Sequence, residues 1–171
     1  INEVYHDAGA RFSGDADILI DPVYAPRIID MLVKKDWRPS ERTLGKPESA
    51  YQIFRTDTFE NGGLTTLDVH WNIFEVDYGA RLLDVIMLHP LPMFAFRETS
   101  WQDAVPMKLG SIECKRLSNE DLLIHAIVHG SGASPARELR WVIDVVAIIR
   151  TLSIDWNKVI TRAHDYGTIV D

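Results

Sequence analysis

Residues 14–20, with the sequence GDADILI, combine two acidic side chains with a short apolar run. On an extended chain, side chains two positions apart project to the same face, so Asp15 and Asp17 would hold their carboxylates close together. Such like charges repel one another unless a cation lies between them, and Mg²⁺ prefers oxygen ligands. The stretch therefore predicts a short β-strand at a magnesium site. The alternative is a solvated turn, because aspartate also favours turns.

A third acid, Asp68, lies in a later apolar stretch at residues 64–74. If this stretch is a β-strand, alternation places Val69 and Trp71 on an apolar face, and Asp68 and His70 on a polar one. Aspartate is rarely found within an apolar strand without a reason. If the two strands are neighbours, the three acids converge. Three carboxylates can hold two metal ions, one that activates an attacking hydroxyl and one that stabilises a triphosphate.

The first half of the chain has the pattern of an α/β unit. Residues 17–20 form a short apolar strand, and residues 22–35 carry apolar side chains at helical spacing. Residues 49–55 and 64–74 are expected to form an antiparallel hairpin, with residues 57–63 as the turn between them.

The second half of the chain is expected to be mainly helical. The expected elements are an uncertain helix at residues 81–87, a small hairpin at 104–116, a helix from the capping-box-like Ser118 to Gly130, a helix at 135–152 and a last helix capped by Asp155. The helix at 135–152 is expected to bury a stripe of Leu139, Val142, Ile143, Val146 and Ile149. The two halves together predict an α/β (α+β) fold, with a sheet lobe over residues 1–75 and a mainly helical lobe over residues 76–171.

The bulk composition excludes several classes of protein. The 171 residues are 46% hydrophobic and 25% charged, which is ordinary for a soluble globular protein of one domain or two small lobes. The net charge of -7 argues against a broad nucleic-acid-binding surface. The apolar runs are shorter than the ~18 residues of a membrane-spanning helix. Cys114 is the only cysteine, which precludes an internal disulfide and fits the reducing cytoplasm.

Three motifs resemble the polymerase-beta-like nucleotidyltransferase superfamily, and most closely a family of uncharacterised bacterial nucleotidyltransferases. The first is Arg11 followed by the Asp15-Ala16-Asp17 element, and the second is DVHW at residues 68–71. The third is the helical stretch LLIHAIVH at residues 122–129, followed by LRWVID at residues 139–144. Together these motifs span nearly the whole chain, and their combination is more specific than any one of them.

The resemblance implies a mixed sheet that bears the three acids, followed by a helical lobe. It also implies a nucleoside triphosphate and Mg²⁺ as ligands, with room for two ions and with Mn²⁺ as a substitute, and transfer of a nucleotidyl group to an unidentified acceptor. We expect Asp15 and Asp17 to bind Mg²⁺, and Asp68 to act as a further ligand and as the general base, or to orient the acceptor hydroxyl. The expected substrate-binding residues are Arg11, His70, Lys108 and Asp144.

One element of the superfamily is missing from this pattern. Members carry a Gly-Gly or Gly-Ser turn on a helix ahead of the Asp-x-Asp motif, where backbone amides meet the triphosphate. Residues 1–10 contain only Gly9, which is too close to the acids to serve, and the chain does not begin with methionine. We therefore expect the natural protein to carry its glycine element in a segment that precedes Ile1.

Several of these residues also have purely structural interpretations. Arg11 could neutralise a neighbouring acid, and His70 could be a partly buried structural histidine. Asp144 could form a salt bridge with Arg140, one helical turn earlier. Lys108 could be an ordinary solvated lysine on a hairpin.

Two other functions stay open at this point. A non-catalytic nucleotide-binding module, or a toxin–antitoxin component with the same fold, would explain the missing glycine motif. A zinc hydrolase could use His125 and His129, which share one helix face, although the glutamate of the His-Glu-x-x-His motif is absent.

Overall fold

The computed structural model of the protein describes residues 4, 5, 7, 9, 15–39, 56–63, 66–71, 92–131 and 140–168. The chain divides into two compact units. The sheet unit comprises residues 12–78, and the helical unit comprises residues 1–11 and 79–171. Each unit has a hydrophobic core of its own. The combination of a mixed sheet with helices confirms the predicted α+β class.

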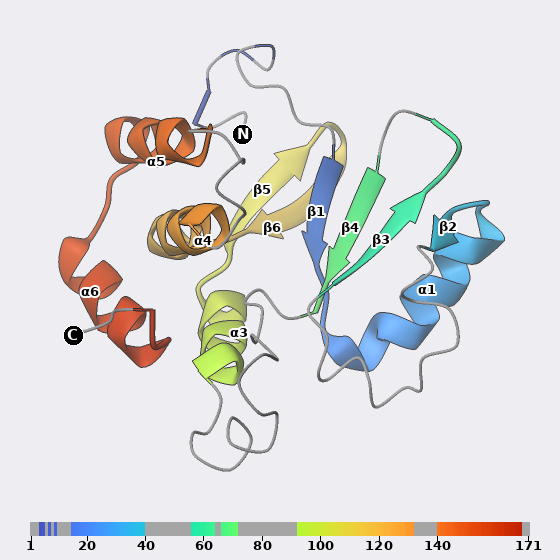
Figure 1. The fold of residues 1–171 in the computed structure, drawn as a ribbon, viewed down its shortest axis with the longest axis horizontal. Coiled ribbons are helices and arrows are strands. Elements are labelled where there is room, and N and C mark those ends of the chain that lie inside the picture. Colours follow the sequence, from blue (N-terminus) through green and yellow to red (C-terminus); the bar gives the residue numbers. More distant parts are fainter. Residues whose placement is uncertain are drawn as a thin grey trace. The chain divides into compact units, whose positions relative to one another are not determined.

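The sheet unit is built on a four-stranded sheet with the strand order β1-β4-β3-β2 (Figure 1). Strand β1 (Asp15–Leu19) pairs in parallel with β4 (Thr66–His70). Strand β4 pairs antiparallel with β3 (Thr56–Glu60), and β3 pairs antiparallel with the short β2 (Arg38–Pro39). The sheet is therefore mixed, and its parallel pair joins the two strands that carry the predicted acids.

Helix α1 (Ala25–Lys34) connects β1 to the rest of the sheet and follows the short 3-10 helix η2 (Pro22–Tyr24). The Asp21 carboxylate accepts a hydrogen bond from the Val23 backbone N–H at 3.0 Å, which satisfies a donor at the start of η2. Lys34 stands in the last turn of α1, where positive charge is favourable. The predicted helix at residues 22–35 is confirmed, with its first turn in the tighter 3-10 form.

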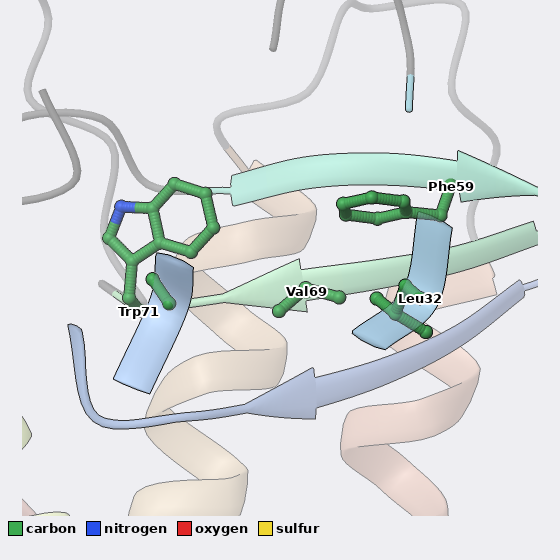
Figure 2. Close-up of a cluster of buried hydrophobic side chains, with 5 residues drawn as sticks. Leu32, Phe59, Val69 and Trp71 are labelled. Atoms are coloured by element: carbon green, nitrogen blue, oxygen red, sulfur yellow. The ribbon is translucent and has the colours of Figure 1, made fainter. Parts of the chain in front are cut away.

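The core of the sheet unit joins α1 to one face of the sheet (Figure 2). Its buried members are Ala25, Leu32, Phe59, Val69 and Trp71. Because side chains alternate along a strand, the burial of Val69 turns its neighbours Asp68 and His70 to the opposite face. A slip of one residue in the pairing of β4 would carry both polar side chains into the core. The apolar core therefore fixes which face holds the acids.

The expected turn at residues 57–63 is wrong in its first half, because Thr56–Glu60 is strand β3. Asp57 and Asn61 favour a turn in the sequence, but Phe59 is 0% exposed and its burial against α1 outweighs that preference. The chain turns later, at Asn61, whose side chain accepts a hydrogen bond from the Gly63 N–H at 3.3 Å. Gly62 has a φ of 76°, a conformation that favours glycine. The expected strand at residues 49–55 lies outside the described residues.

The helical unit combines helices with a two-stranded hairpin. Its described elements are α3 (Pro92–Gln102), β5 (Val105–Leu109), β6 (Ile112–Arg116), α4 (Asn119–Ser131), α5 (Arg140–Thr151) and α6 (Trp156–Asp165). Helix α4 packs against both α5 and α6. The buried core residues are Val4, Leu123 and Ile148.

Local signals at the element ends agree with the sequence-based expectations. The Ser118 hydroxyl accepts the Asp121 N–H at 3.2 Å at the start of α4, and the Asp155 carboxylate accepts the Lys158 N–H at 3.2 Å at the start of α6. Gly110 turns the β5–β6 hairpin with a φ of 61°. The predicted hairpin and both predicted helix starts are confirmed.

Helix α3 was not expected. Its apolar side chains do not recur at helical spacing, and its start is marked only by Pro92, which is tolerated at the first position of a helix. The helix expected at residues 81–87 lies outside the described residues, as do residues 132–139 at the start of the helix expected at 135–152.

The expected buried stripe of α5 is wrong at three of its five residues, whereas Val142 is half-buried and Leu139 lies outside the described residues. Ile143, Val146 and Ile149 are 59%, 42% and 41% exposed, whereas Ile148 is buried and Val145 packs against the same core. Helix α5 carries apolar residues on several sides, so periodicity alone does not select the face that is buried.

The contact between α4 and α5 depends on Gly130 in the last turn of α4. A Cβ atom at this position would lie 2.3 Å from both Cβ and Cγ of Trp141, far inside van der Waals contact. A side chain at position 130 therefore requires Trp141 to move.

We predict that Gly130→Ala destabilises the protein by about 1–3 kcal/mol, the usual cost of forcing extra atoms into a packed contact. The free energy of unfolding from urea denaturation measures this. The sign of the effect is decisive, because alanine in a helix without such a contact is favoured over glycine by about 1 kcal/mol. A more stable variant would show that α4 and α5 do not pack this way.

A buried charge network joins α4 to α6. Arg162 is 6% exposed, and its Nη1 donates to Asp121 Oδ2 at 2.5 Å and to Ser118 Oγ at 3.2 Å. The Tyr166 hydroxyl donates to the other Asp121 oxygen at 3.2 Å, and burial raises the pKa of Tyr166 to about 12. Arg162 also pairs with Asp103, directly after α3. Burial opposes the charge on Arg162, but Asp121 outweighs it and raises the pKa of the guanidinium.

We predict that Arg162→Met lowers the free energy of unfolding by about 3–5 kcal/mol, because it leaves the fully buried Asp121 carboxylate without its counter-charge. Lys34→Met is the control. Lys34 pairs with Asp30 at 2.6 Å, but the two side chains are 72% and 63% exposed, so its loss should cost less than about 1 kcal/mol. Equal losses for the two variants in urea denaturation would contradict the assigned importance of the buried pair.

Candidate metal centre

The site is built by the register of the parallel strands β1 and β4. Asp17 lies directly opposite Asp68, and Asp15 lies opposite Thr66. Partner residues on neighbouring strands point to the same face of a sheet, and so do residues two apart on one strand. Asp15, Asp17, Asp68 and His70 therefore share the face opposite the α1 core. The local sequence produces this arrangement because Val69, between Asp68 and His70, is completely buried.

Three of these side chains come close enough to share one ion. Ligand atoms of Asp17, Asp68 and His70 all lie within 4.8 Å of one another. His70 Nε2 is 2.9 Å from Asp17 Oδ1, a hydrogen bond in which the ring N–H donates to the carboxylate. Among the described residues, this is the one group of three or more acids, histidines or cysteines with ligand atoms at such short range.

The group is buried at one end and open at the other. His70 is 6% exposed and Asp68 is half-buried, whereas the Asp17 side chain is 57% exposed. Substrate and water can therefore approach from the Asp17 end. At the buried end, the backbone of His70 is paired with the segment that follows β1, since the Ile20 N–H donates to the His70 carbonyl oxygen at 2.7 Å.

Three of the six buried polar atoms without a hydrogen-bond partner in the described structure lie on the same face, and the other three lie elsewhere. Asp68 Oδ1, His70 Nδ1 and Thr56 Oγ1 are buried and have no hydrogen-bond partner in the described part of the chain. Thr56 lies opposite His70 on β3. Leaving a buried polar atom without a partner costs about 1–3 kcal/mol, and more for a charged group. A divalent cation fits this observation, because a buried carboxylate oxygen without a donor is a ready ligand.

The other predicted site residues lie elsewhere. Asp15 is exposed on β1, on the same face, but is not a member of the close group. Arg11 lies outside the described residues. Lys108 is exposed on β5 of the helical unit, opposite Glu113. Asp144 is half-buried on α5 and accepts a hydrogen bond from the Tyr5 hydroxyl at 2.6 Å. Asp17, Asp68 and His70 are thus the predicted residues that the structure brings together.

The histidine pair of α4 forms a contact of a different kind. The rings of His125 and His129 stack with centroids 5.4 Å apart and planes 20° from parallel. Within the described ranges, no group of three or more close metal-ligating residues includes either histidine. Nothing in the described structure therefore adds to the zinc interpretation.

Sequence reasoning did not single out Thr56 or Tyr5. Thr56 stood between a predicted strand and a predicted turn, so its place opposite His70 was not evident. An extended reading of residues 56–60, with Phe59 as the buried residue, would have placed Thr56 and Thr58 on the polar face. The hydrogen bond between Tyr5 and Asp144 joins residues 139 positions apart, and no local sequence pattern predicts it.

The fold and the site define a class of protein: an α+β protein whose mixed sheet carries an Asp-x-Asp strand beside an Asp-x-His strand, with acids and histidine close enough to hold a metal ion. Residues 1–168 match a family described as uncharacterised nucleotidyltransferase, and the chain belongs to this family. Nucleotidyltransferases are transferases of phosphorus-containing groups, and membership of this family implies a nucleotide substrate. The predicted resemblance to a family of uncharacterised nucleotidyltransferases is therefore confirmed. A comparison with curated proteins found no match. No helix in the described ranges combines the length and apolar character needed to cross a membrane.

Proposed function

We propose that the protein is a magnesium-dependent nucleotidyltransferase that moves a nucleoside monophosphate from a nucleoside triphosphate to a hydroxyl acceptor. The observation that supports this most is the side-by-side position of Asp17 and Asp68, together with a buried Asp68 oxygen that lacks a hydrogen-bond partner among the described residues. Membership of the family supports the reaction class. Because nucleoside triphosphates are made and kept inside cells, we also propose a cytoplasmic location.

In this proposal Asp17 and Asp68 would hold one ion. Asp15, which is exposed on the same face but outside the close group, would bind that ion or a second one. When bound, Mg²⁺ supplies neutralisation of the triphosphate charge and of the charge that develops on the leaving group. The three carboxylates come from two adjacent strands, so the pairing of β1 with β4 fixes the backbone that carries them before substrate arrives.

The transfer itself requires one proton acceptor. The acceptor hydroxyl oxygen bonds to the α-phosphorus, the bond from that phosphorus to the bridging oxygen breaks, and pyrophosphate leaves with the electron pair. Asp68 takes the hydroxyl proton or orients the hydroxyl for attack. Arg11, His70, Lys108 and Asp144 remain the residues that we expect to contact the substrate complex, and the two cations among them suit phosphate oxygens.

We predict that the Asp15→Asn, Asp17→Asn double variant and the Asp68→Asn variant each lose nucleotidyl transfer by on the order of 100-fold or more, because they remove charge that the ion and the transition state require. The measurement is Mg²⁺-dependent pyrophosphate release from each nucleoside triphosphate, together with transfer of an α-phosphate label to pooled small-molecule, protein and RNA acceptors. Stability should change little, since removing clustered negative charge relieves repulsion.

The matched control is Asp30→Asn on α1, which removes an exposed acid of the same unit that pairs with Lys34 at 2.6 Å. It should retain full activity. Equal activity in the site variants and in this control would refute the assigned site. Mg²⁺-dependent nucleotide binding without transfer to any acceptor would instead favour a non-catalytic nucleotide-binding module.

A further inference from the structure

We propose that His70 is a direct ligand of the metal ion and makes this site select Mn²⁺ over Mg²⁺. The inference rests on the proposed function in one respect, namely that the group of Asp17, Asp68 and His70 is the site that the ion occupies. His70, which we expect to contact the substrate complex, then contacts its metal ion rather than the nucleotide itself.

The first support is position. A ligand atom of His70 lies within 4.8 Å of ligand atoms of both Asp17 and Asp68, and Nε2 is 2.9 Å from Asp17 Oδ1. An ion that binds both carboxylates in this arrangement therefore has the imidazole within reach. By the same criterion, Asp15 lies outside the close group. The nearest set of three ligands is two carboxylates and one imidazole, rather than the three carboxylates expected from the sequence.

The second support is rigidity. His70 is 6% exposed and lies between Val69 and Trp71, which are 0% and 1% exposed in the core of the sheet unit. The ring cannot turn to solvent without disturbing this strand. A histidine that merely neutralised an exposed acid would not need to be buried in this way, and surface pairs of that kind contribute little.

The third support is the state of the ring nitrogens. Nε2 makes its hydrogen bond to Asp17, whereas Nδ1 is buried without a hydrogen-bond partner among the described residues. If Nε2 held an ion, it would no longer donate to Asp17, and the proton of the neutral ring would be on Nδ1. Metal-bound histidine normally donates that second N–H to an acceptor. Thr56 Oγ1 is a buried oxygen on the residue directly opposite His70, also without a hydrogen-bond partner among the described residues, and is within the reach of a cross-strand pair.

The ligand chemistry gives the selectivity. Mg²⁺ prefers an octahedral shell of oxygen atoms and retains its waters, so an imidazole adds little to its binding. First-row transition ions accept nitrogen as well as oxygen, and later members of the series gain the most from an imidazole. Mn²⁺ lies at the weak end of this order but shares the carboxylate preference of Mg²⁺, so a comparison of Mn²⁺ with Mg²⁺ isolates the contribution of the imidazole. A site that contains His70 therefore binds Mn²⁺ more tightly than an all-carboxylate site would, while its affinity for Mg²⁺ changes little.

The test is the binding of Mn²⁺ and of Mg²⁺ to the full chain without nucleotide, by isothermal titration calorimetry. The variants are His70→Gln, Asp68→Asn and the control Asp30→Asn. We expect wild type and Asp30→Asn to bind Mn²⁺ at least about 10-fold more tightly than Mg²⁺. His70→Gln should lower Mn²⁺ affinity by about 10-fold or more and Mg²⁺ affinity by less than about 3-fold, because glutamine keeps an oxygen ligand. An unchanged Mn²⁺/Mg²⁺ ratio in a folded His70→Gln variant would overturn the inference.

A second readout needs no variant. Pulsed electron paramagnetic resonance of wild-type protein loaded with Mn²⁺ should show modulation from a directly coordinated ¹⁴N nucleus, and its absence would overturn the role of His70 even if His70→Gln does not fold. Loss of both ions in Asp68→Asn, with no nitrogen coupling in the wild type, would leave the proposed site standing and remove His70 from it. Nitrogen coupling without any nucleotidyl transfer would sustain the metal ligand and count against the proposed function.

Discussion

The pairing of β1 with β4 in parallel, with Asp17 opposite Asp68, is the constraint on which the candidate site depends. Two carboxylates on adjacent strands repel each other, so this register needs a compensating gain. Burial of Val69 and Trp71 against α1 supplies it on β4, because a slip of that strand by one residue would turn Val69 out of the core and Asp68 into it (Figure 2). Ile20, directly after β1, packs against the same core. Stability and chemistry are thus divided between the two faces of one sheet, and the apolar face sets the geometry of the polar face.

In the helical unit, by contrast, the buried charges of Arg162 and Asp121 are paired with each other. This buried pair is joined to Ser118 and Tyr166, so both Asp121 carboxylate oxygens have hydrogen-bond donors. A satisfied network of this kind fixes how α4 and α6 pack, since either charge without the other would be costly. The metal-capable group differs because Asp68 Oδ1 and His70 Nδ1 have no hydrogen-bond partner among the described residues. This contrast is the structural reason to regard the Arg162–Asp121 network as part of the scaffold, and the group of Asp17, Asp68 and His70 as a binding site.

Much of this could be predicted from the sequence where the local pattern agrees with the tertiary structure. The strand that carries Asp15 and Asp17, the alternation around Asp68, and the start of α4 at Ser118 all follow from short-range periodicity and capping. Prediction failed where packing decides between patterns of equal local merit. The Asn- and Gly-containing segment at residues 57–63 predicts a turn, but the burial of Phe59 makes its first half part of strand β3. In α5 the apolar residues cover more than one side, so periodicity alone assigns the wrong side to the core. That His70 lies within hydrogen-bond distance of Asp17 could not be predicted, since the contact depends on how two strands pair whose residues are 53 positions apart.

The central claim is that Asp17, Asp68 and His70 converge on one side of the sheet to hold a divalent ion. Anomalous diffraction from crystals of the protein grown with Mn²⁺ tests this directly, because the signal locates the ion without reference to activity. We predict a single strong peak from an ion that is bonded to both carboxylates and to a ring nitrogen of His70, or two peaks if a second ion binds toward Asp15. A well-ordered sheet without a peak at this group, or with Asp17 and Asp68 on opposite faces, would contradict it.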